Sequence, residues 1–291
     1  SSDLSIGPDA VAGGMADIGV ATTPDVNSQH WNSSKYAQAV SNAGFAFSYT
    51  PWLRSIVNDI DLAYLAGYYK ISDLAGTVSA SFRYFSLGEI QLRENADAKP
   101  IPVKPYELAF DAGYSRMLSE HFSMGVAFRF IVSDLSARSE EYYPGSAFSA
   151  DINGYYALPI DIKTGESKLG LGFNLSNLGT KISYDKNETS NFLPTDLRFG
   201  ASYLVPFDRY NRLSVSLDFD KLLVPSRNSK FTEGYDPNDA DTWAMTEDEY
   251  NNLSVMKGLA WSFSDAPGGF SEEMEEINFA LGVEYAYNEQ F

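Results

Sequence analysis

The sequence predicts an all-β protein, an antiparallel transmembrane β-barrel, and three observations support that prediction. Apolar and polar side chains alternate with a period of two along most of the 291 residues, as in strands whose two faces meet different surroundings. The connections between the alternating segments are, in turn along the chain, short turns and longer polar loops, as in outer-membrane barrels. Aromatic residues make up 14% of the chain, and they favour sheets and the girdles of membrane barrels.

The alternation predicts about ten strands. In one segment, Tyr106, Leu108, Phe110, Ala112 and Tyr114 share one face, and Glu107, Ala109, Asp111 and Gly113 share the other. The same pattern occurs in residues 45–49, 62–68, 77–84, 122–130, 148–158, 169–175, 197–205, 213–219 and 279–287.

The connections between these segments are of two kinds. Short turns are expected near residues 71–76, 118–121, 159–167 and 207–211, and longer polar loops near residues 51–59, 93–105, 139–145 and 179–194. Because short turns of outer-membrane barrels face the periplasm and long loops face outside, the first strand is expected to run outward. We therefore expect an outer-membrane location with a periplasmic N-terminus.

A soluble β-sandwich would also alternate and is the alternative fold. The polar faces of the expected strands are rich in Gly, Ala and Ser, and residues 122–132 exceed the about five or six residues of an ordinary strand. Aromatic pairs at Tyr68-Tyr69, Tyr142-Tyr143 and Tyr155-Tyr156 fall near strand ends. These features favour the membrane barrel. Helical spans are excluded, because no run of about 20 apolar residues occurs.

The longest connection, residues 221–276, is expected to be an extracellular insertion. It contains an acidic stretch, residues 235–249, followed by apolar residues at helical spacing from residue 252 onward. Ser254 is the expected N-cap, and Pro267-Gly268-Gly269 is the expected stop. An insertion of this size is usually functional, and the alternative is an irregular loop with an incidental helix.

The N-terminal segment, residues 1–43, does not alternate and precedes the strands of residues 44–291. It is rich in Gly and polar residues and includes His30, Trp31 and Asn32. Polar side chains line the interior of membrane barrels, so we expect this segment to plug the lumen. An exposed tail is the alternative.

A search for reactive chemistry predicts no enzyme, no cofactor and no metal site. The chain has only His30 and His121, and neither lies in a nucleophile motif. Asp236, Asn238, Asp239 and Asp241 resemble a calcium loop, but Ala240 interrupts the spacing. Glu272, Glu273, Glu275 and Glu276 are interpreted as a solvated face rather than as paired catalytic carboxylates. The net charge of -18 disfavours nucleic acid as a partner.

Residues 19–32, with the sequence GVATTPDVNSQHWN, resemble the segment before the first strand of FadL-like outer-membrane barrels. More closely, the chain is similar to the PorV (LptO) family of the Bacteroidetes type IX secretion system. The likeness continues through residues 47–53 (FSYTPWL), 61–69 (DLAYLAGYY), 83–90 (RYFSLGEI), 221–225 (KLLVP) and 262–270 (SFSDAPGGF).

The resemblance implies a FadL-like barrel of 14 strands, of which about ten are visible in this chain. We therefore expect about four closing strands to be absent after Phe291. The chain departs from the family at Asn32-Ser33-Ser34, where relatives often carry a Pro-containing triplet, so the geometry of that turn is left open.

The resemblance also implies a carrier function. Such barrels bind the C-terminal signal domain of secreted cargo at the translocon barrel (SprA/Sov-like). They pass the cargo to a surface attachment complex that contains the sortase-like PorU, and outer-membrane lipid surrounds them. Aromatic side chains on the outward loops are the candidate contacts: Trp52, Tyr142, Tyr143, Trp243, Tyr250, Trp261 and Phe263. The alternatives are a FadL-like transporter of hydrophobic small molecules and a paralogous barrel that anchors the sortase complex.

Overall fold

The computed structural model describes residues 2–51, 59–72, 75–92, 99–135, 143–163, 165–185 and 189–287. Ten strands form one sheet: β1 (Ala43–Pro51), β2 (Ile60–Ser72), β3 (Gly76–Leu87), β6 (Tyr106–Met117), β7 (Phe122–Asp134), β8 (Gly145–Ile162), β9 (Gly165–Gly179), β10 (Asp196–Pro206), β11 (Asn211–Leu222) and β12 (Ile277–Tyr287). Two short strands, β4 (Ile90–Leu92) and β5 (Ile101–Val103), form a separate hairpin.

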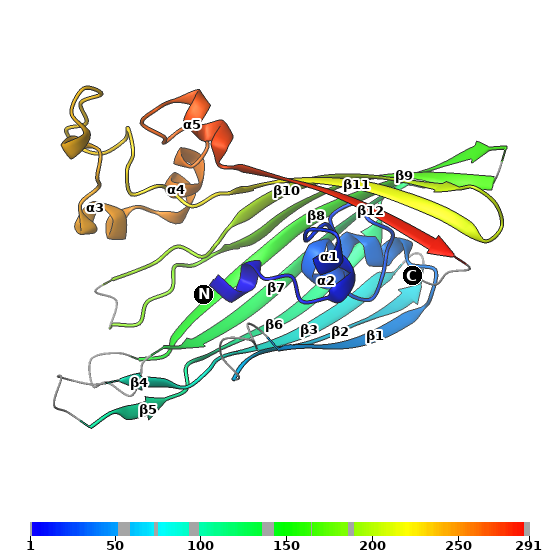
Figure 1. Ribbon diagram of the computed structural model, residues 1–291, viewed down its shortest axis with the longest axis horizontal. Coiled ribbons are helices and arrows are strands. Elements are labelled where there is room, and N and C mark those ends of the chain that lie inside the picture. Colours follow the sequence, from blue (N-terminus) through cyan, green and yellow to red (C-terminus); the bar gives the residue numbers. More distant parts are fainter. Residues whose placement is uncertain are drawn as a thin grey trace.

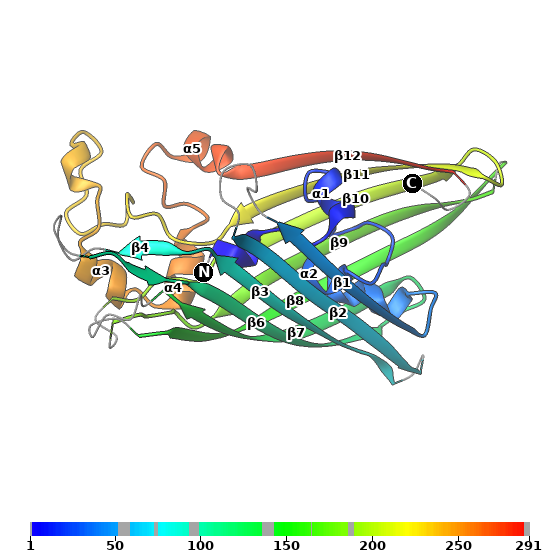
Figure 2. The same ribbon diagram turned by 60° about the horizontal axis from the view of Figure 1, so that its bottom comes forward.

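Every pair of neighbours in the large sheet is antiparallel, and the spatial order β1-β2-β3-β6-β7-β8-β9-β10-β11-β12 follows the chain. The sheet curves strongly, and β1 and β12 are at the two ends of this order (Figures 1 and 2). The all-β prediction is confirmed, and ten strands of the described residues form this sheet.

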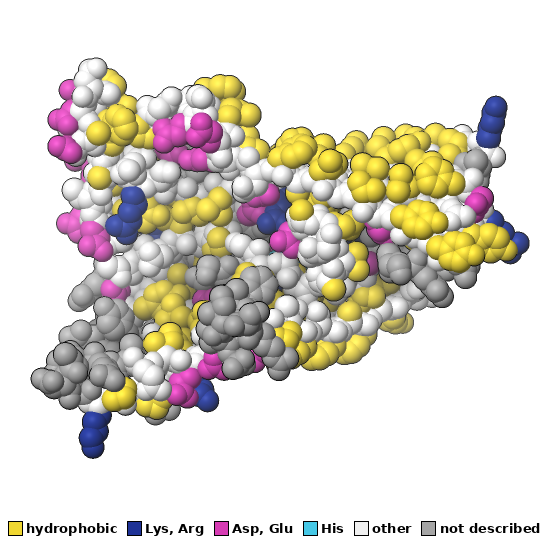
Figure 3. Space-filling model, viewed as in Figure 1, with side chains coloured by type: hydrophobic (Ala, Val, Ile, Leu, Met, Phe, Trp, Pro, Cys, Tyr) yellow, Lys and Arg dark blue, Asp and Glu magenta, His cyan; other side chains and the backbone are white. Residues whose placement is uncertain are grey.

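The two faces of the sheet differ in polarity because successive side chains of a strand point to opposite sides. On the outer face, Phe45, Phe128 and Phe279 are 72%, 66% and 61% exposed. Figure 3 shows hydrophobic side chains over much of this surface. On the inner face, Asp111 and Ser216 are buried. The predicted alternation in residues 106–114 therefore separates an apolar outer face from a polar inner face.

Two of the aromatic pairs do not belong wholly to an outer girdle. Tyr68 and Tyr155 are buried on the inner face. The ring of Tyr68 stacks on Tyr36 of the N-terminal segment, with 4.5 Å between the ring centroids. The girdle interpretation is wrong for these two residues, because neighbours in a strand necessarily face opposite sides of the sheet.

The short turns and the long connections lie at opposite ends of the sheet (Figure 1). The turn predicted at residues 159–167 is shorter, because β8 continues to Ile162 and β9 begins at Gly165. Strand β5 lies within the loop predicted at residues 93–105, and it pairs with β4, which precedes that loop. The large insertion consists of residues 223–276, because β11 ends at Leu222 and β12 begins at Ile277.

The insertion contains four short helices: η3 (Ala240–Thr242), α3 (Glu247–Asn252), α4 (Val255–Trp261) and α5 (Phe270–Glu275). Ser254 caps α4, as predicted, by accepting a hydrogen bond from the Lys257 amide at 3.3 Å. The helix ends at Trp261, before the predicted Pro-Gly-Gly stop. Phe263 therefore lies beyond the helix.

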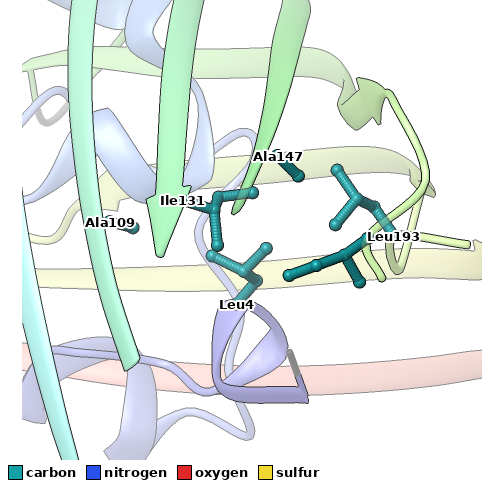
Figure 4. Packing of buried hydrophobic residues seen from close by; sticks show 6 residues of the cluster. Leu4, Ala109, Ile131, Ala147 and Leu193 are labelled. Atoms are coloured by element: carbon teal, nitrogen blue, oxygen red, sulfur yellow. The ribbon is translucent and has the colours of Figure 1, made fainter. Parts of the chain in front are cut away.

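The N-terminal segment, residues 2–38, lies within the concave side of the sheet (Figures 1 and 2). It contains η1 (Ser2–Ser5), α1 (Ala10–Gly14), α2 (Ser28–Trp31) and η2 (Ser33–Gln38). Figure 4 shows Leu4 of η1 packed among buried apolar side chains. Ala109, Ile131 and Ala147 come from β6, β7 and β8, and Ile182 and Leu193 from the β9–β10 connection.

In the part of the chain that the structure describes, the longest helix, α4, has only seven residues, and no helix is long and apolar enough to cross a membrane.

Candidate functional site

The backbone of residues 19–21 is bound by polar side chains of the inner face. The Asp218 carboxylate on β11 accepts hydrogen bonds from the amides of Gly19 and Val20 at 3.0 and 3.1 Å. The Ser202 hydroxyl on β10 donates to the Ala21 carbonyl at 2.6 Å. Buried backbone groups need such partners, so these strands satisfy a segment that has no regular structure of its own.

Asn32, one of the predicted plug residues, joins the N-terminal segment to β8. Its fully buried side-chain amide donates to the carbonyls of Val20 and Gly154, both at 2.9 Å. Its side-chain oxygen accepts from the Ser34 amide at 3.2 Å and so caps η2. The Asn32-Ser33-Ser34 triplet thus starts a 3-10 helix.

The following residues add further contacts to β8 and bind β7 as well. The Asn153 side-chain oxygen on β8 accepts from the Ser33 hydroxyl at 3.1 Å and from the Ser34 amide at 2.9 Å. The Gln38 amide donates to the Ser123 hydroxyl on β7 at 3.0 Å and to the Tyr155 carbonyl at 3.2 Å. These contacts fix η2 against the inner face.

Trp31 and His30, the other predicted plug residues, are held by charged groups. The Trp31 indole donates to the Asp9 carboxylate at 2.8 Å, and the Arg198 guanidinium lies 5.3 Å from the centre of its ring system. Arg83 lies 2.8 Å from His30 Nδ1. Because a guanidinium only donates, Nδ1 accepts this bond and His30 is the neutral tautomer with the proton on Nε2.

Glycines on the inner face allow the N-terminal segment to approach the strands closely. A Cβ atom on Gly172 of β9 would lie 2.5 Å from the Val20 carbonyl oxygen, closer than real Cβ contacts. The abundance of small residues on the polar faces, which favoured a barrel over a sandwich, therefore makes room for the N-terminal segment.

Sequence reasoning missed a charged cluster that joins four strands, β6 to β9, on the inner face of the sheet. Arg129 of β7 donates to Asp111 at 2.5 Å and to Asp151 at 2.9 Å, and it also contacts Asn177. All these side chains are buried. The sequence showed these charged residues at the polar positions of the alternating pattern. It could not show which of them contact one another, because they lie on different strands.

Two spaces border the N-terminal segment. A cavity of about 420 Å³ lies between it and strands β1 and β10 to β12, and its lining includes Trp31, Asp25, Arg212 and Glu284. The space beside His30 and Arg198 is only about 10 Å³. The cavity next to Trp31 has charged walls, and His30 is not among its lining residues.

The predicted contact residues of the insertion differ in accessibility. Phe263 is 51% exposed and Trp243 is half-buried, with its indole donating to the Asp236 carbonyl at 2.9 Å. Trp261 is half-buried in a stack with Phe231.

Tyr250, in contrast, is buried: its ring packs edge-on against Phe192, with Arg227 4.8 Å from the ring centre. Of the other predicted contacts, Tyr143 is 45% exposed, and Trp52 and Tyr142 lie outside the described residues.

The insertion is attached to the sheet through Lys221 of β11. Its ammonium lies 3.0 Å from Glu273 and 2.6 Å from Glu276. The interpretation of the glutamate run as a solvated face is therefore wrong for Glu273, which is buried, and right for Glu272 and Glu275, which are exposed. A helix of fewer than two turns can turn one acidic residue inward and its neighbours outward.

Asp265 is a third carboxylate beside this pair. Its ligand atom lies within 4.8 Å of those of Glu273 and Glu276, a spacing that a metal ion could bridge. The Lys221 ammonium supplies positive charge to two of the three groups. Burial, reinforced by the negative charges of Glu273 and Glu276, raises the pKa of Asp265 to about 6.

A curved antiparallel sheet with an apolar outer face and a polar inner face is the arrangement of an outer-membrane β-barrel protein. A family model described as type IX secretion system protein PorV matches residues 2–229. The chain therefore belongs to the PorV family, and it is an outer-membrane component of type IX protein secretion.

No curated protein matches the chain. Among solved structures, the chain is similar to in-vitro folded OmpT, an outer membrane protein of Vibrio cholerae, with 10% sequence identity and a TM-score of 0.37. The similarity covers 86% of this chain and 62% of that chain, so this chain spans less than two thirds of that structure.

Proposed function

We propose that this protein is a carrier that binds the C-terminal signal domains of secreted cargo at the translocon barrel and transfers them to the attachment complex with the sortase-like PorU. One observation carries the proposal. The insertion is folded, attached to β11 and apolar in part, with Met256, Phe263 and Phe270 66%, 51% and 80% exposed. Exposed apolar groups of this kind favour protein partners.

The N-terminal segment supports the same proposal as a lumen plug. It is hydrogen-bonded to strands β3, β7, β8, β10 and β11. A segment bound at so many points favours a filled interior and binding at the loops. We infer that the protein has no catalytic activity and needs no cofactor.

The second candidate function is transport of hydrophobic small molecules, with the N-terminal segment as a movable hatch. The cavity of about 420 Å³ beside Trp31 is the observation that favours it, since Val11 and Ile18 contribute apolar lining. Asp9, Asp25, Arg212 and Glu284 also line it, and these charges are unfavourable for an apolar solute. The remaining alternative is a paralogous barrel that anchors the sortase complex. Such a barrel would retain the sortase complex, whereas a carrier would retain the translocon barrel or cargo signal domains.

A pull-down tests the proposal. The intact protein, solubilised in mild detergent, is expected to retain the translocon barrel or cargo signal domains. Phe263→Ser with Phe270→Ser should lower that retention, because it removes exposed apolar groups of the insertion. Phe207→Ser is the matched control, since Phe207 is also 51% exposed but lies in a short turn at the opposite end of the sheet.

Two results would contradict the carrier function. In the first, the wild-type protein retains neither the translocon barrel nor cargo signal domains, and deletion of the protein abolishes fatty-acid uptake. This result would indicate a transporter. Alternatively, only the sortase complex is retained, which indicates an anchor.

A further inference from the structure

The insertion carries much of the negative charge of the protein. Residues 223–276 contain twelve acidic and three basic residues, so they contribute nine of the eighteen net negative charges of the chain. Figure 3 shows acidic side chains gathered over this region, whereas the neighbouring strand surface is largely hydrophobic. Such a surface attracts positively charged partners and repels acidic ones.

Within the insertion, an open groove of about 390 Å³ combines this charge with aromatic surface. Phe231 and Trp261 stack with their ring centroids 4.8 Å apart and their planes at 23°. Met245 and Leu253 contribute further apolar lining. The groove therefore has an apolar base that could cover the aliphatic part of a long side chain.

Acidic groups border the same groove. Glu233 and Glu249 both line it, and the Glu249 carboxylate accepts a hydrogen bond from the Glu233 amide at 3.1 Å. Glu249 also accepts from the Thr246 amide at 2.7 Å, as part of a capping box that fixes its position. The Glu249 carboxylate is thus held in place beside an aromatic face, and the exposed Glu233 side chain adds a second negative charge to the same groove.

The chain's own cation indicates what the groove accepts. Among the described residues that line it, Lys257 is the basic one, and its ammonium lies 4.3 Å from the centre of the Trp261 ring system. A cation over the face of an indole is a favourable arrangement. Lys257 is itself exposed, so an incoming cation can displace it.

We propose that this groove binds a lysine or arginine side chain on a basic surface of the protein partner. Its charged group would lie between Glu233 and Glu249, and its aliphatic part over Trp261 and Phe231. This inference rests on the proposed carrier function, and it identifies the bound partner as a cargo signal domain with a basic contact face. Arginine and aromatic side chains commonly dominate the energy of protein interfaces, which agrees with this pairing.

The test measures the Kd of a purified cargo signal domain for the intact protein in detergent at several NaCl concentrations. Glu233→Gln with Glu249→Gln should weaken binding about tenfold at low salt and reduce the salt dependence. Gln at position 249 keeps the capping box, so α3 is preserved. Trp261→Ala should weaken binding by a similar factor.

The matched control is Glu272→Gln with Glu275→Gln, which removes two charges from the same insertion outside the groove. It should change the Kd less than twofold. Lys257→Gln should act in the opposite direction and tighten binding about threefold, because it removes the competing cation. Unchanged migration of the unheated protein in SDS gels confirms that each variant is folded.

The outcomes separate this inference from the carrier function. If the wild type binds no cargo domain, the carrier function fails, and this inference fails with it. If the wild type binds and the groove variants bind equally well, only the groove assignment is wrong. If the groove double variant and the control double variant weaken binding equally, the groove assignment is also wrong. Binding would then depend on the overall negative charge of the insertion and not on the groove.

Discussion

At the scale of single residues, the inner face of the sheet provides partners for backbone groups that would otherwise be buried without hydrogen bonds. Asp218 accepts from two consecutive amides, and Asn32 donates to two carbonyls from different parts of the chain. Leaving such a group unsatisfied costs more than a single hydrogen bond contributes. These residues therefore determine how firmly residues 2–38 are held.

Asp218→Ala should loosen the N-terminal segment. It leaves the buried amides of Gly19 and Val20 without their carboxylate acceptor, at a cost of about 1–3 kcal/mol. Hydrogen exchange of these two amides should become faster in the variant. Asp218→Asn is the control, because its side-chain oxygen can still accept; equal exchange in wild type and Asp218→Ala would show that other groups hold the segment.

Gly172→Ala should destabilise the fold by about 1–3 kcal/mol, as overpacking of a tight contact does. The added methyl group would lie 2.5 Å from the Val20 carbonyl oxygen. Gly13→Ala is the matched control, since a Cβ there meets nothing within 4 Å. Thermal unfolding followed by gel migration measures both, and an equal effect of the two substitutions would contradict the close approach.

At the scale of elements, the insertion depends on the pairing between β11 and α5. Lys221 forms ion pairs with both Glu273 and Glu276, and Glu273 also accepts a hydrogen bond from the Ala266 amide at 2.7 Å. The Asp265 carboxylate accepts from the Ser226 amide at 2.7 Å and so joins the two ends of the insertion. A change at this cluster should affect the insertion and leave the sheet intact.

Lys221→Met should destabilise the attachment of α5 by about 2–3 kcal/mol, because it leaves a buried carboxylate without its counter-charge. Hydrogen exchange of the Ala266 amide should accelerate, whereas exchange within β6 and β7 should not change. Lys221→Arg keeps the charge and should retain most of the protection. Unaltered exchange in Lys221→Met would show that the ion pair does not hold α5.

The stability of the insertion should fall as pH rises from about 4 to 7. The folded-state pKa of Asp265, about 6, lies above its ordinary value of 3.8. The stability that protonated Asp265 contributes to the folded insertion is therefore fully present below pH 3.8. It is lost as the pH rises through the folded-state pKa of about 6. Exchange of the Ser226 amide, corrected for the intrinsic rate, should report this loss. In Asp265→Asn the pH dependence should be weaker, and identical profiles would contradict the assignment.

At the scale of the whole molecule, the sheet encloses a segment that is hydrogen-bonded to five of its strands and leaves charged walls around the remaining cavity. If the carrier function is correct, this segment has no need to move. A covalent link between the segment and the sheet distinguishes a fixed plug from a hatch.

Ser33→Cys with Asn153→Cys should form such a link, because the Ser33 hydroxyl lies 3.1 Å from the Asn153 side-chain oxygen and the sequence contains no other cysteine. Secretion of cargo should be the same in the oxidised and reduced protein. Fatty-acid uptake that is lost on oxidation and restored by reduction would instead establish a hatch. Each single-cysteine variant, treated in the same way, controls for oxidation.

The local pattern determined the strands, because a period of two depends only on each strand having one apolar and one polar side. Residues 106–114 show this, and so does Ser254, whose capping role depends on residues three positions apart. The fold class was therefore within reach of the sequence, whereas the candidate contacts Phe263 and Trp243 stay predictions.

Only the tertiary structure decided which polar groups meet. Asp218 lies 199 residues from Gly19, and Lys221 lies 52 residues from Glu273. Nothing in the local pattern distinguishes Glu273 from Glu272, or Tyr250 from Trp261, because burial depends on what the rest of the chain places beside each side chain. Spacing along the sequence thus determined the sheet and its two faces, whereas long-range packing decided the position of the N-terminal segment and the shape of the groove.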